Sequence, residues 1–119
     1  MKVVVTSQGD SLDSVVDQRF GRGAWFLVVD LESDEVTALD NAAGAGAGQG
    51  AGVQAAQAVA SSGAGALLTG HCGPKAFMLL DQAGVSVYTG VEGTVREAVE
   101  AYKAGSLEAT SKPDVDGHW

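Results

Sequence analysis

Short apolar runs alternate with polar or glycine-rich stretches along the whole chain. Five of these runs are rich in β-branched or aliphatic residues and have the length of strands. They comprise residues 2–6, 24–31, 35–40, 64–70 and 84–90. Because only the turn sequence ESD separates the second run from the third, these two are expected to pair as an antiparallel hairpin.

Three further stretches have the apolar spacing of helices. They comprise residues 53–63, the segment that begins at Pro74, and the segment between Thr94 and Gly105. Proline is well tolerated at the first helical position, because the amide it lacks would have no intrahelical partner there. The last helix has the clearest boundaries, because Thr94 and Glu97 have the spacing of a capping box and a glycine follows the last apolar position.

The resulting order of elements, β-β-β-α-β-α-β-α, predicts an α/β fold. We expect a five-stranded mixed sheet with an N-terminal antiparallel hairpin and three main helices packed on it. The 119 residues fit one domain, residues 1–107, followed by a mobile C-terminal tail, residues 108–119, which has no periodicity. Ligands of such sheets bind beyond the carboxyl ends of parallel strands. The segments that start at Ser7, Asn41 and Gly70 all follow predicted strands, which points to one rim.

Charge and composition narrow the classes of function. Seven basic residues stand against 15 acidic ones, and a net charge of -8 argues against nucleic-acid or membrane-surface partners. The single cysteine cannot form an intramolecular disulfide, and no apolar run approaches the ~20 residues of a membrane span, so a cytoplasmic location is expected. Residues 41–80 contain no Asp or Glu, which fits either buried elements or the docking of an anion.

Two of the seven basic residues lie in the sequence QRFGRG, residues 18–23. Guanidinium groups are always charged and offer five donors, so Arg19 and Arg22 suit an oxyanion or a sulfide-bearing anion. The alternative is that these arginines only pair with nearby acids such as Asp13 or Asp17.

The sequence TGHCGP places His71 next to Cys72, between a predicted strand and a predicted helix. A lone cysteine is most often a small buried apolar residue, yet a helix N-terminus favours the thiolate. Imidazole and thiolate suit copper, zinc or iron, but His118 is the only other histidine or cysteine, so a closed four-ligand site is not available. An iron–sulfur cluster held by four cysteines of one chain is excluded.

The glycine-rich tract has several interpretations. GAGQGA, residues 46–51, matches the form of a dinucleotide fingerprint, but no acidic residue follows at the distance that binds a ribose. A loop that closes over a ligand and a plain linker are the alternatives. Two enzyme hypotheses have less support. A Cys–His nucleophile–base dyad lacks an evident orienting group. A two-metal nuclease needs several converging carboxylates, for which Asp10, Asp30 and Asp40 could be proposed, but the predicted rim is poor in acidic residues.

The chain resembles the dinitrogenase iron–molybdenum cofactor biosynthesis family over residues 2 to about 107. The resemblance is carried by RFGRGAWFLVVDLE, DN at residues 40–41, GAGVQAAQAVASSGAGALLTG, GPKAFMLLDQAGVSVYTG and GTVREAVEAYKAGSL. It implies a ribonuclease-H-like, three-layer α/β fold and a protein that binds or carries metal–sulfur cofactors and is not an enzyme. Many members have a histidine at the position of Arg19, so this departure favours a charge role there.

The resemblance and the residues together predict a carrier of an anionic, non-covalently held metal–sulfur cluster that contains molybdenum with copper or iron. Its partners would be the cluster or a thiomolybdate-type anion, and a donor or acceptor protein. His71 and Cys72 are the candidate metal ligands. The other expected cofactor-binding residues are Ser7, Gln8, Arg19, Phe20, Gly21, Arg22, Asn41, Gly46, Gly48, Gly50, Gly73 and Lys75. A ribonuclease-H-like phosphodiesterase and a nucleotide-binding regulatory module are the alternative functions.

Overall fold

The structure is a computed structural model that describes residues 1–21, 23–41 and 51–110. Its strands and helices follow the predicted order. They are β1 (Lys2–Ser7), β2 (Trp25–Asp30), β3 (Val36–Asp40), α2 (Ala51–Ser61), β4 (Ala66–Leu68), α3 (Pro74–Gln82), β5 (Ser86–Tyr88) and α4 (Val95–Lys103). Strands β4 and β5 are shorter than predicted. At β5 the reason is that Gly84 and Gly90, the two ends of the predicted strand, adopt positive φ angles that end the extended backbone.

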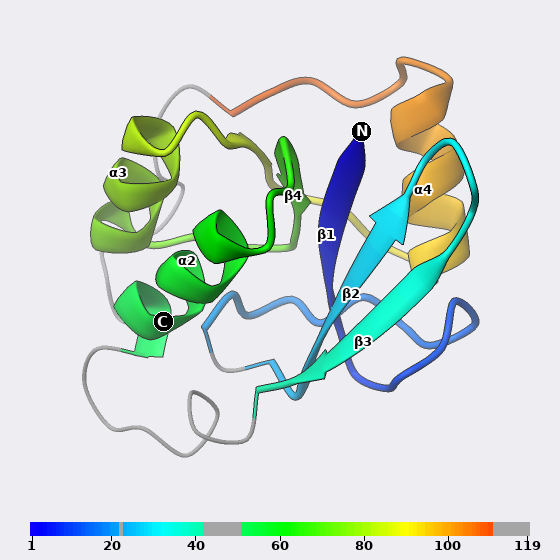
Figure 1. Ribbon diagram of the computed structural model, residues 1–119, viewed down its shortest axis with the longest axis horizontal. Helices are drawn as coiled ribbons and strands as arrows, with labels where there is room; N and C mark the ends of the chain where they lie inside the picture. The colour runs from blue at the N-terminus through cyan, green and yellow to red at the C-terminus, as the bar shows by residue number, and fades with distance from the viewer. Residues whose placement is uncertain (22, 42–50, 111–119) are drawn as a thin grey trace.

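The five strands form one mixed sheet in the order β3-β2-β1-β4-β5 (Figure 1). Strands β1, β2 and β3 pair antiparallel in succession, as the predicted hairpin requires, whereas β1, β4 and β5 run parallel. The predicted α/β class, the mixed five-stranded sheet and the three helices are thus confirmed.

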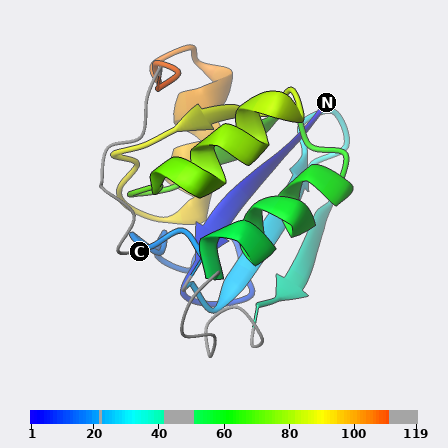
Figure 2. The same ribbon diagram turned by 90° about the vertical axis from the view of Figure 1, so that its left-hand side faces the viewer.

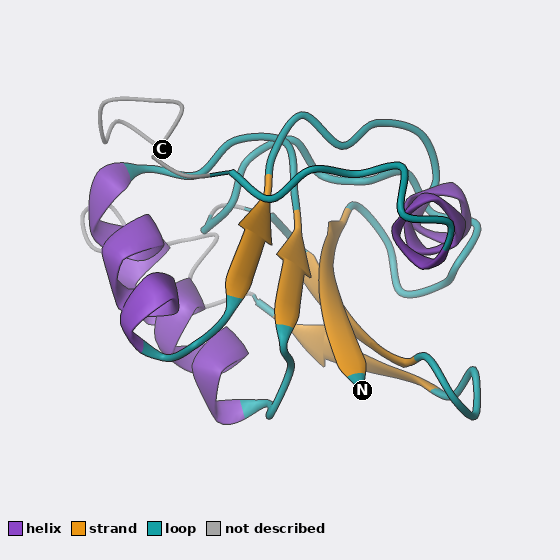
Figure 3. Cartoon of the chain, turned by 90° about the horizontal axis from the view of Figure 1, so that it is seen from above, coloured by secondary structure: helices purple, strands orange, loops and turns teal. Residues whose placement is uncertain are grey.

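Helices cover both faces of the sheet, which gives three layers (Figure 3). Helices α2 and α3 pack on one face and α4 packs on the other, each over its own cluster of buried residues. Strand β1 contributes to both clusters, because Val4 faces α2 and α3 while Val3 and Val5 face α4. A central strand that is buried on both faces is a continuous apolar run, and this explains why residues 3–5 show no polar alternation.

The capping box of α4 is present as predicted. The Thr94 hydroxyl accepts a hydrogen bond from the Glu97 amide (3.2 Å), and the Thr94 amide donates to the Glu97 carboxylate (2.9 Å). The Thr94 amide lowers the pKa of the Glu97 carboxyl, and so, to a smaller extent, does the Thr94 hydroxyl, which also donates to this carboxylate (3.1 Å). The element with the most complete local signals therefore forms where those signals place it.

After α4 the chain returns along the edge strand β5. The Thr110 amide donates to the carbonyl of Val87 (2.7 Å), and its hydroxyl bonds the Thr89 amide (3.1 Å) and hydroxyl (2.8 Å). The last nine residues of the predicted tail lie outside the described residues, so the predicted boundary at residue 107 stays a prediction. Within the described part of the chain, no helix is long and apolar enough to cross a membrane.

Candidate functional site

One rim of the sheet collects the segments that the sequence singled out. Strands β1, β3, β4 and β5 end at this rim and β2 begins there, as the pairing of Ser7 with Trp25 and of Trp25 with Asp40 shows. In Figure 2, β1 and β3 both run toward the lower side of the view, where β2 starts. The segments that follow Ser7, Asp40 and Leu68 therefore leave the sheet on the same side.

Two loops lie side by side on this rim: the arginine loop, of which residues 18–21 and 23 are described, and the His–Cys loop, residues 70–73. The Phe20 amide donates to the carbonyl of His71 (3.1 Å), and Arg19 and His71 form an isolated parallel bridge. Gly70 makes this approach possible: a Cβ there would lie 2.6 Å from the Cα of Gln18 and 2.7 Å from its carbonyl oxygen. Two motifs that are 52 residues apart in sequence thus form one surface.

The arginine loop is held in place by a buried aromatic side chain and by hydrogen bonds from Asn41. The Phe20 ring is buried and packs against Phe26, with 6.1 Å between ring centroids. Gly21 has a φ of 96°, a left-handed conformation that favours glycine. The amide nitrogen Nδ2 of Asn41 donates to the carbonyls of Gly21 (3.2 Å) and Gly23 (2.8 Å). Phe20 and Asn41 were predicted to bind a cofactor, and the structure places both beneath the loop, where they position it.

Arg19 both pairs with an acid and remains accessible. Its Nε lies 3.8 Å from Oδ1 of Asp17, and its backbone amide donates to the same oxygen (3.0 Å). The arginine side chain is 53% exposed while that of Asp17 is 10% exposed. The other acid considered, Asp13, pairs instead with Arg96 (3.2 Å). Asp17 thus offsets part of the positive charge of Arg19 but leaves the guanidinium open to a further anion.

His71 and Cys72 occupy different environments although they are adjacent. His71 is half-buried at the rim. Cys72 is fully buried in the core cluster between the sheet and helices α2 and α3, where its thiol lies 3.7 Å from the carbonyl of Gly73. A ligand that rests on the rim therefore meets the His71 side of this loop before it can reach the sulfur.

The N-terminus of α3 adjoins the same loop. Gly73 is the N-cap residue, its backbone is extended, and no side chain caps the helix there. Pro74 occupies the first turn, and Lys75 follows with an exposed side chain. First-turn amides have no intrahelical acceptors and carry the positive end of the helix dipole, so this end favours a negative ligand.

Other predicted site residues are placed elsewhere or not described. Ser7 is fully buried, and its hydroxyl donates to the carbonyl of Gly9 (2.6 Å) and accepts from the Gly9 amide (3.2 Å). Gln8 is exposed, and its amide donates to the carbonyl of Val15 (2.9 Å). Four predicted residues lie outside the described residues: Arg22, Gly46, Gly48 and Gly50.

A buried hydroxyl pair supports the rim and was not predicted. The hydroxyls of Thr6 and Thr69 are 2.8 Å apart, and that of Thr6 donates to the carbonyl of Asp17 (2.7 Å). These bonds tie the ends of β1 and β4 to the start of the arginine loop. The signal was in the sequence, because VVVT and ALLT each place a threonine directly after a run of apolar residues.

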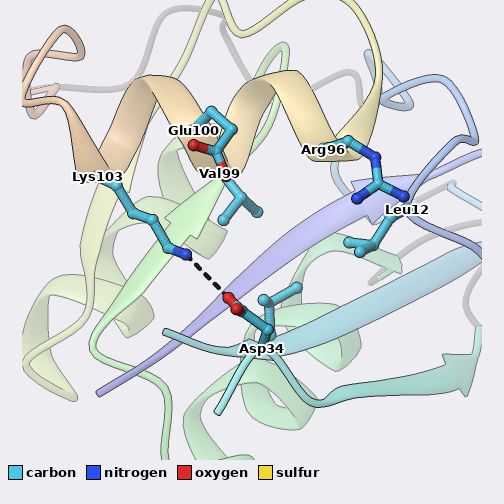
Figure 4. A pocket seen from close by; sticks show the side chains of 7 residues that line it. Leu12, Asp34, Arg96, Val99, Glu100 and Lys103 are labelled. Carbon is cyan, nitrogen blue, oxygen red and sulfur yellow. Dashed lines mark hydrogen bonds and ion pairs between the residues drawn. The ribbon is translucent and has the colours of Figure 1, made fainter. Parts of the chain in front are cut away.

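The described residues form a pocket but no cluster of side chains suited to bind a metal ion. No group of three or more His, Cys, Asp or Glu side chains there is placed to hold a metal ion. A pocket of about 180 Å³ lies between α4 and the β2–β3 turn (Figure 4). It is lined by Leu12, Val29, Asp34, Arg96, Val99, Glu100 and Lys103. None of these is a predicted site residue, so the rim and not this pocket carries the candidate chemistry.

The profile of the dinitrogenase iron-molybdenum cofactor family matches residues 1–105. The chain belongs to this family. Among functionally curated protein sequences, none matches the chain. Membership of the dinitrogenase cofactor family agrees with the resemblance that the motifs carry.

Solved structures of similar chains agree with this assignment. The apo form of the orange protein (ORP) from Desulfovibrio gigas is 45% identical, with a TM-score of 0.93 and 96% of each chain covered. A NifB-like protein from Thermotoga is 34% identical, with a TM-score of 0.79 and coverage of 96% of this chain and 98% of its own. A dinitrogenase-related protein from Methanocaldococcus jannaschii, 15% identical with a TM-score of 0.69 and coverage of 95% and 97%, shares the fold. The family and the likeness to the orange protein fit a cofactor-binding or carrier protein.

Proposed function

We propose that this protein binds and carries an anionic metal–sulfur cluster that contains molybdenum with copper or iron. The rim formed by the arginine loop and the His–Cys loop is the proposed binding surface. The observation that carries the proposal is the direct backbone contact between Arg19 and His71, which brings a cation and a soft-metal ligand together. The family assignment supports a metal–sulfur cargo. We infer that the protein is cytoplasmic and that the cluster passes between it and a donor or acceptor protein.

The charges on the rim suit a thiomolybdate-type anion. The exposed guanidinium of Arg19 and the ammonium of Lys75 offset negative charge, and the uncapped start of α3 offers amides to the sulfides. Arg22 and the glycines at positions 46, 48 and 50 are predicted to add a second cation and further amides. Binding of this kind holds the cluster as an anion and does not need four protein ligands.

In this proposal His71 is the residue that contacts the soft metal. Its side chain is half-buried at the rim, and imidazole is a suitable ligand for copper. The sulfur of Cys72 is fully buried in the core, so its contact with a rim-bound cluster would require the loop to open. Cys72 therefore serves here mainly to anchor the loop.

The charge role is tested by anaerobic uptake of tetrathiomolybdate, followed by equilibrium dialysis and molybdenum analysis. Arg19→Ala is expected to weaken uptake about fivefold, since one charge beside a partly exposed anion contributes about 1 kcal/mol. Arg96→Ala, which removes the same charge from α4, is the matched control and should leave uptake unchanged. Equal uptake by wild type and Arg19→Ala would overturn the role of Arg19.

Ligation is tested by adding copper(I) to the thiomolybdate complex. His71→Ala should lower the copper retained per molybdenum while uptake of thiomolybdate alone stays close to that of wild type. Cys72→Ala should retain copper and lose only stability, because it removes a buried side chain. Copper loss in Cys72→Ala with retention in His71→Ala would assign the contact to the thiol instead.

The alternative functions give a different result in a simple assay. Phosphodiester hydrolysis by divalent metals requires carboxylates that converge on the metals, and the described residues contain no such group. We therefore expect no cleavage of RNA or DNA with Mg²⁺ or Mn²⁺, and no shift in melting temperature with nucleotides. Metal-dependent cleavage that survives repurification would overturn the carrier proposal.

A further inference from the structure

Strand β3 is an edge of the sheet that stays open among the described residues. The sheet order places β3 outermost, next to β2 only (Figure 1). The opposite edge, β5, is met by Thr110. Four of the five residues of β3 are exposed, and Val36 is half-buried. Among the described residues, the β5 edge is thus partly covered by a later segment of the chain, whereas the β3 edge is not.

The pairing of β2 with β3 shows which backbone groups point away from the sheet. The Asp30 amide donates to the carbonyl of Glu35 (2.9 Å), and the Asn41 amide donates to the carbonyl of Ala24 (2.9 Å). In an antiparallel ladder such bonds recur at every second residue, so Thr37 and Leu39 also face β2. The amide and carbonyl groups of Val36 and Ala38 therefore face outward, at the spacing that an added strand needs.

Three features that commonly protect edge strands, namely lysine, proline and a bulge, are missing from β3. Natural edges carry lysine, proline or a bulge that prevents pairing with another chain. The strand sequence VTALD contains neither residue, and its register with β2 is continuous from residue 36 to residue 40. Leu39 adds an apolar side chain that is 37% exposed. An unprotected edge of this kind is suited to strand addition.

Charge indicates the kind of strand that fits. The segment from residue 31 to residue 41 contains four acidic residues and no basic one. Ion pairs partly offset the negative charge of two of these acids, because Asp34 pairs with Lys103 (2.9 Å) and Glu32 lies 3.7 Å from the amino terminus. Glu35 is exposed and directly precedes the strand, whereas Asp40, the last residue of the strand, has an interaction of its own. Pairing with a second copy would bring two such acidic edges together, whereas a basic segment would be attracted.

We propose that the β3 edge binds an extended basic segment of a partner protein by strand addition. The outward backbone groups of Val36 and Ala38 supply the hydrogen bonds, and the exposed carboxylate of Glu35, within an acidic turn, selects lysine or arginine in the partner. This interaction surface is independent of the cluster, because it uses the edge of the sheet and not the rim residues Arg19 and His71.

The test uses the full chain and two capped peptides, KVTVTK and its acidic counterpart EVTVTE. In a two-dimensional NMR titration, KVTVTK should shift the amide resonances of Val36 and Ala38 and slow their hydrogen exchange. The amides of Thr37 and Leu39 already bond β2 and should change less. EVTVTE should cause no change at the same concentration. No shift with KVTVTK up to millimolar concentration overturns the proposal.

Two matched pairs of variants locate the binding. Ala38→Pro removes only an outward amide and should weaken KVTVTK at least about fivefold, the effect of roughly one hydrogen bond, while Ala38→Val keeps that amide and should bind normally. Glu35→Lys should weaken KVTVTK, while Asp81→Lys makes the same charge change on an exposed position of α3 and should not. If neither Ala38→Pro nor Glu35→Lys changes the affinity for KVTVTK, the assignment of binding to this edge is wrong.

A second copy is the competing occupant. If the Val36 and Ala38 amides become protected as the protein alone is concentrated, and light scattering shows a dimer, then the edge joins two copies and the proposal is wrong. Concentration-independent exchange and a monomeric mass, together with binding of KVTVTK, support it.

Discussion

Replacing Asn41 tests whether this residue holds the arginine loop in place. Its side chain is 7% exposed, and its Nδ2 group donates to the carbonyls of Gly21 and Gly23. Asn41→Ala removes both donors and leaves two carbonyls of buried residues without them. We expect a less stable protein and a loop that presents Arg19 less accurately.

The magnitude follows from the two bonds that are lost. Each intramolecular hydrogen bond contributes about 1 kcal/mol, and an unpaired buried carbonyl costs about as much or more, so Asn41→Ala should cost about 2–3 kcal/mol. For a chain of 119 residues, this corresponds to a fall in melting temperature of roughly 6–12 °C. Gln57→Ala removes a similar amide from an exposed position on α2 and is the control, with an expected change within about 0.5 kcal/mol.

Urea unfolding followed by circular dichroism measures both variants. If Asn41→Ala falls within the range of Gln57→Ala, then the two hydrogen bonds contribute nothing and the reasoning fails. Uptake of tetrathiomolybdate is a second readout that depends on the proposed function. A weaker uptake at a temperature where the variant is fully folded would show that the loop, and not the fold, is affected.

Asn41→Asp adds a pH test of the same contact. The introduced carboxyl would face two carbonyl oxygens, which favour its protonated form and raise its pKa above the ordinary 3.9. The folded state then binds a proton more tightly than the unfolded state does. The variant should therefore be most stable at low pH and lose stability as the pH rises through the raised pKa. A variant whose stability relative to wild type does not change between pH 4 and pH 7 would contradict this.

Three further predictions concern other parts of the fold. Gly70→Ala should lower the free energy of unfolding in urea by about 2 kcal/mol or more, because its Cβ would clash with the backbone of the arginine loop. Gly84→Ala has open space around it and should lower the free energy of unfolding by only about 1 kcal/mol, through its positive φ. Equal losses in the two variants would contradict the close approach at Gly70. Cys72 is fully buried, so its alkylation by iodoacetamide should be at least about a hundredfold slower in native protein than in urea, and comparable rates would show that the loop opens readily. Thr94→Ala should cost about 1 kcal/mol by removing the helix cap. Since the pKa of Glu97 is lowered, the contribution of the cap should be complete at neutral pH and decline as the pH falls through that pKa, and a pH-independent cost would argue against the capping box.

The charges of the described pocket give a physical reason to place the proposed site at the rim instead. The pocket between α4 and the β2–β3 turn is lined by charges of both signs, and the Lys103 ammonium lies 2.9 Å from a carboxylate oxygen of Asp34. This ion pair raises the pKa of Lys103, chiefly through the hydrogen bond to Asp34. The cation is thus already engaged by a partner. At the rim, by contrast, the Arg19 guanidinium is 3.8 Å from its acid and is about half exposed.

Local signals in the sequence determined most of the secondary structure. The capping box at Thr94, the proline at the start of α3 and the apolar runs of the strands act over a few residues, so they can be recognised without the fold. The order of the elements then limited the topology, because each crossover between parallel strands must pass over one face of the sheet. The gathering of three loops on one rim followed from that order.

Only the tertiary structure decided what the loop residues do. Arg19 and His71 are 52 positions apart, and their contact depends on Gly70 admitting the backbone of Gln18, which no local pattern reveals. Whether the cysteine next to His71 faced the rim or the core depended on the direction of one loop, and packing against α2 and α3 buried it. Asn41 is a comparable case, since an asparagine after a strand fits a ligand or a loop equally well, and its role depends on where two distant carbonyls lie. The sequence thus indicated candidate anion-binding residues, and the packing of the loops decided which of these candidates are exposed at the rim.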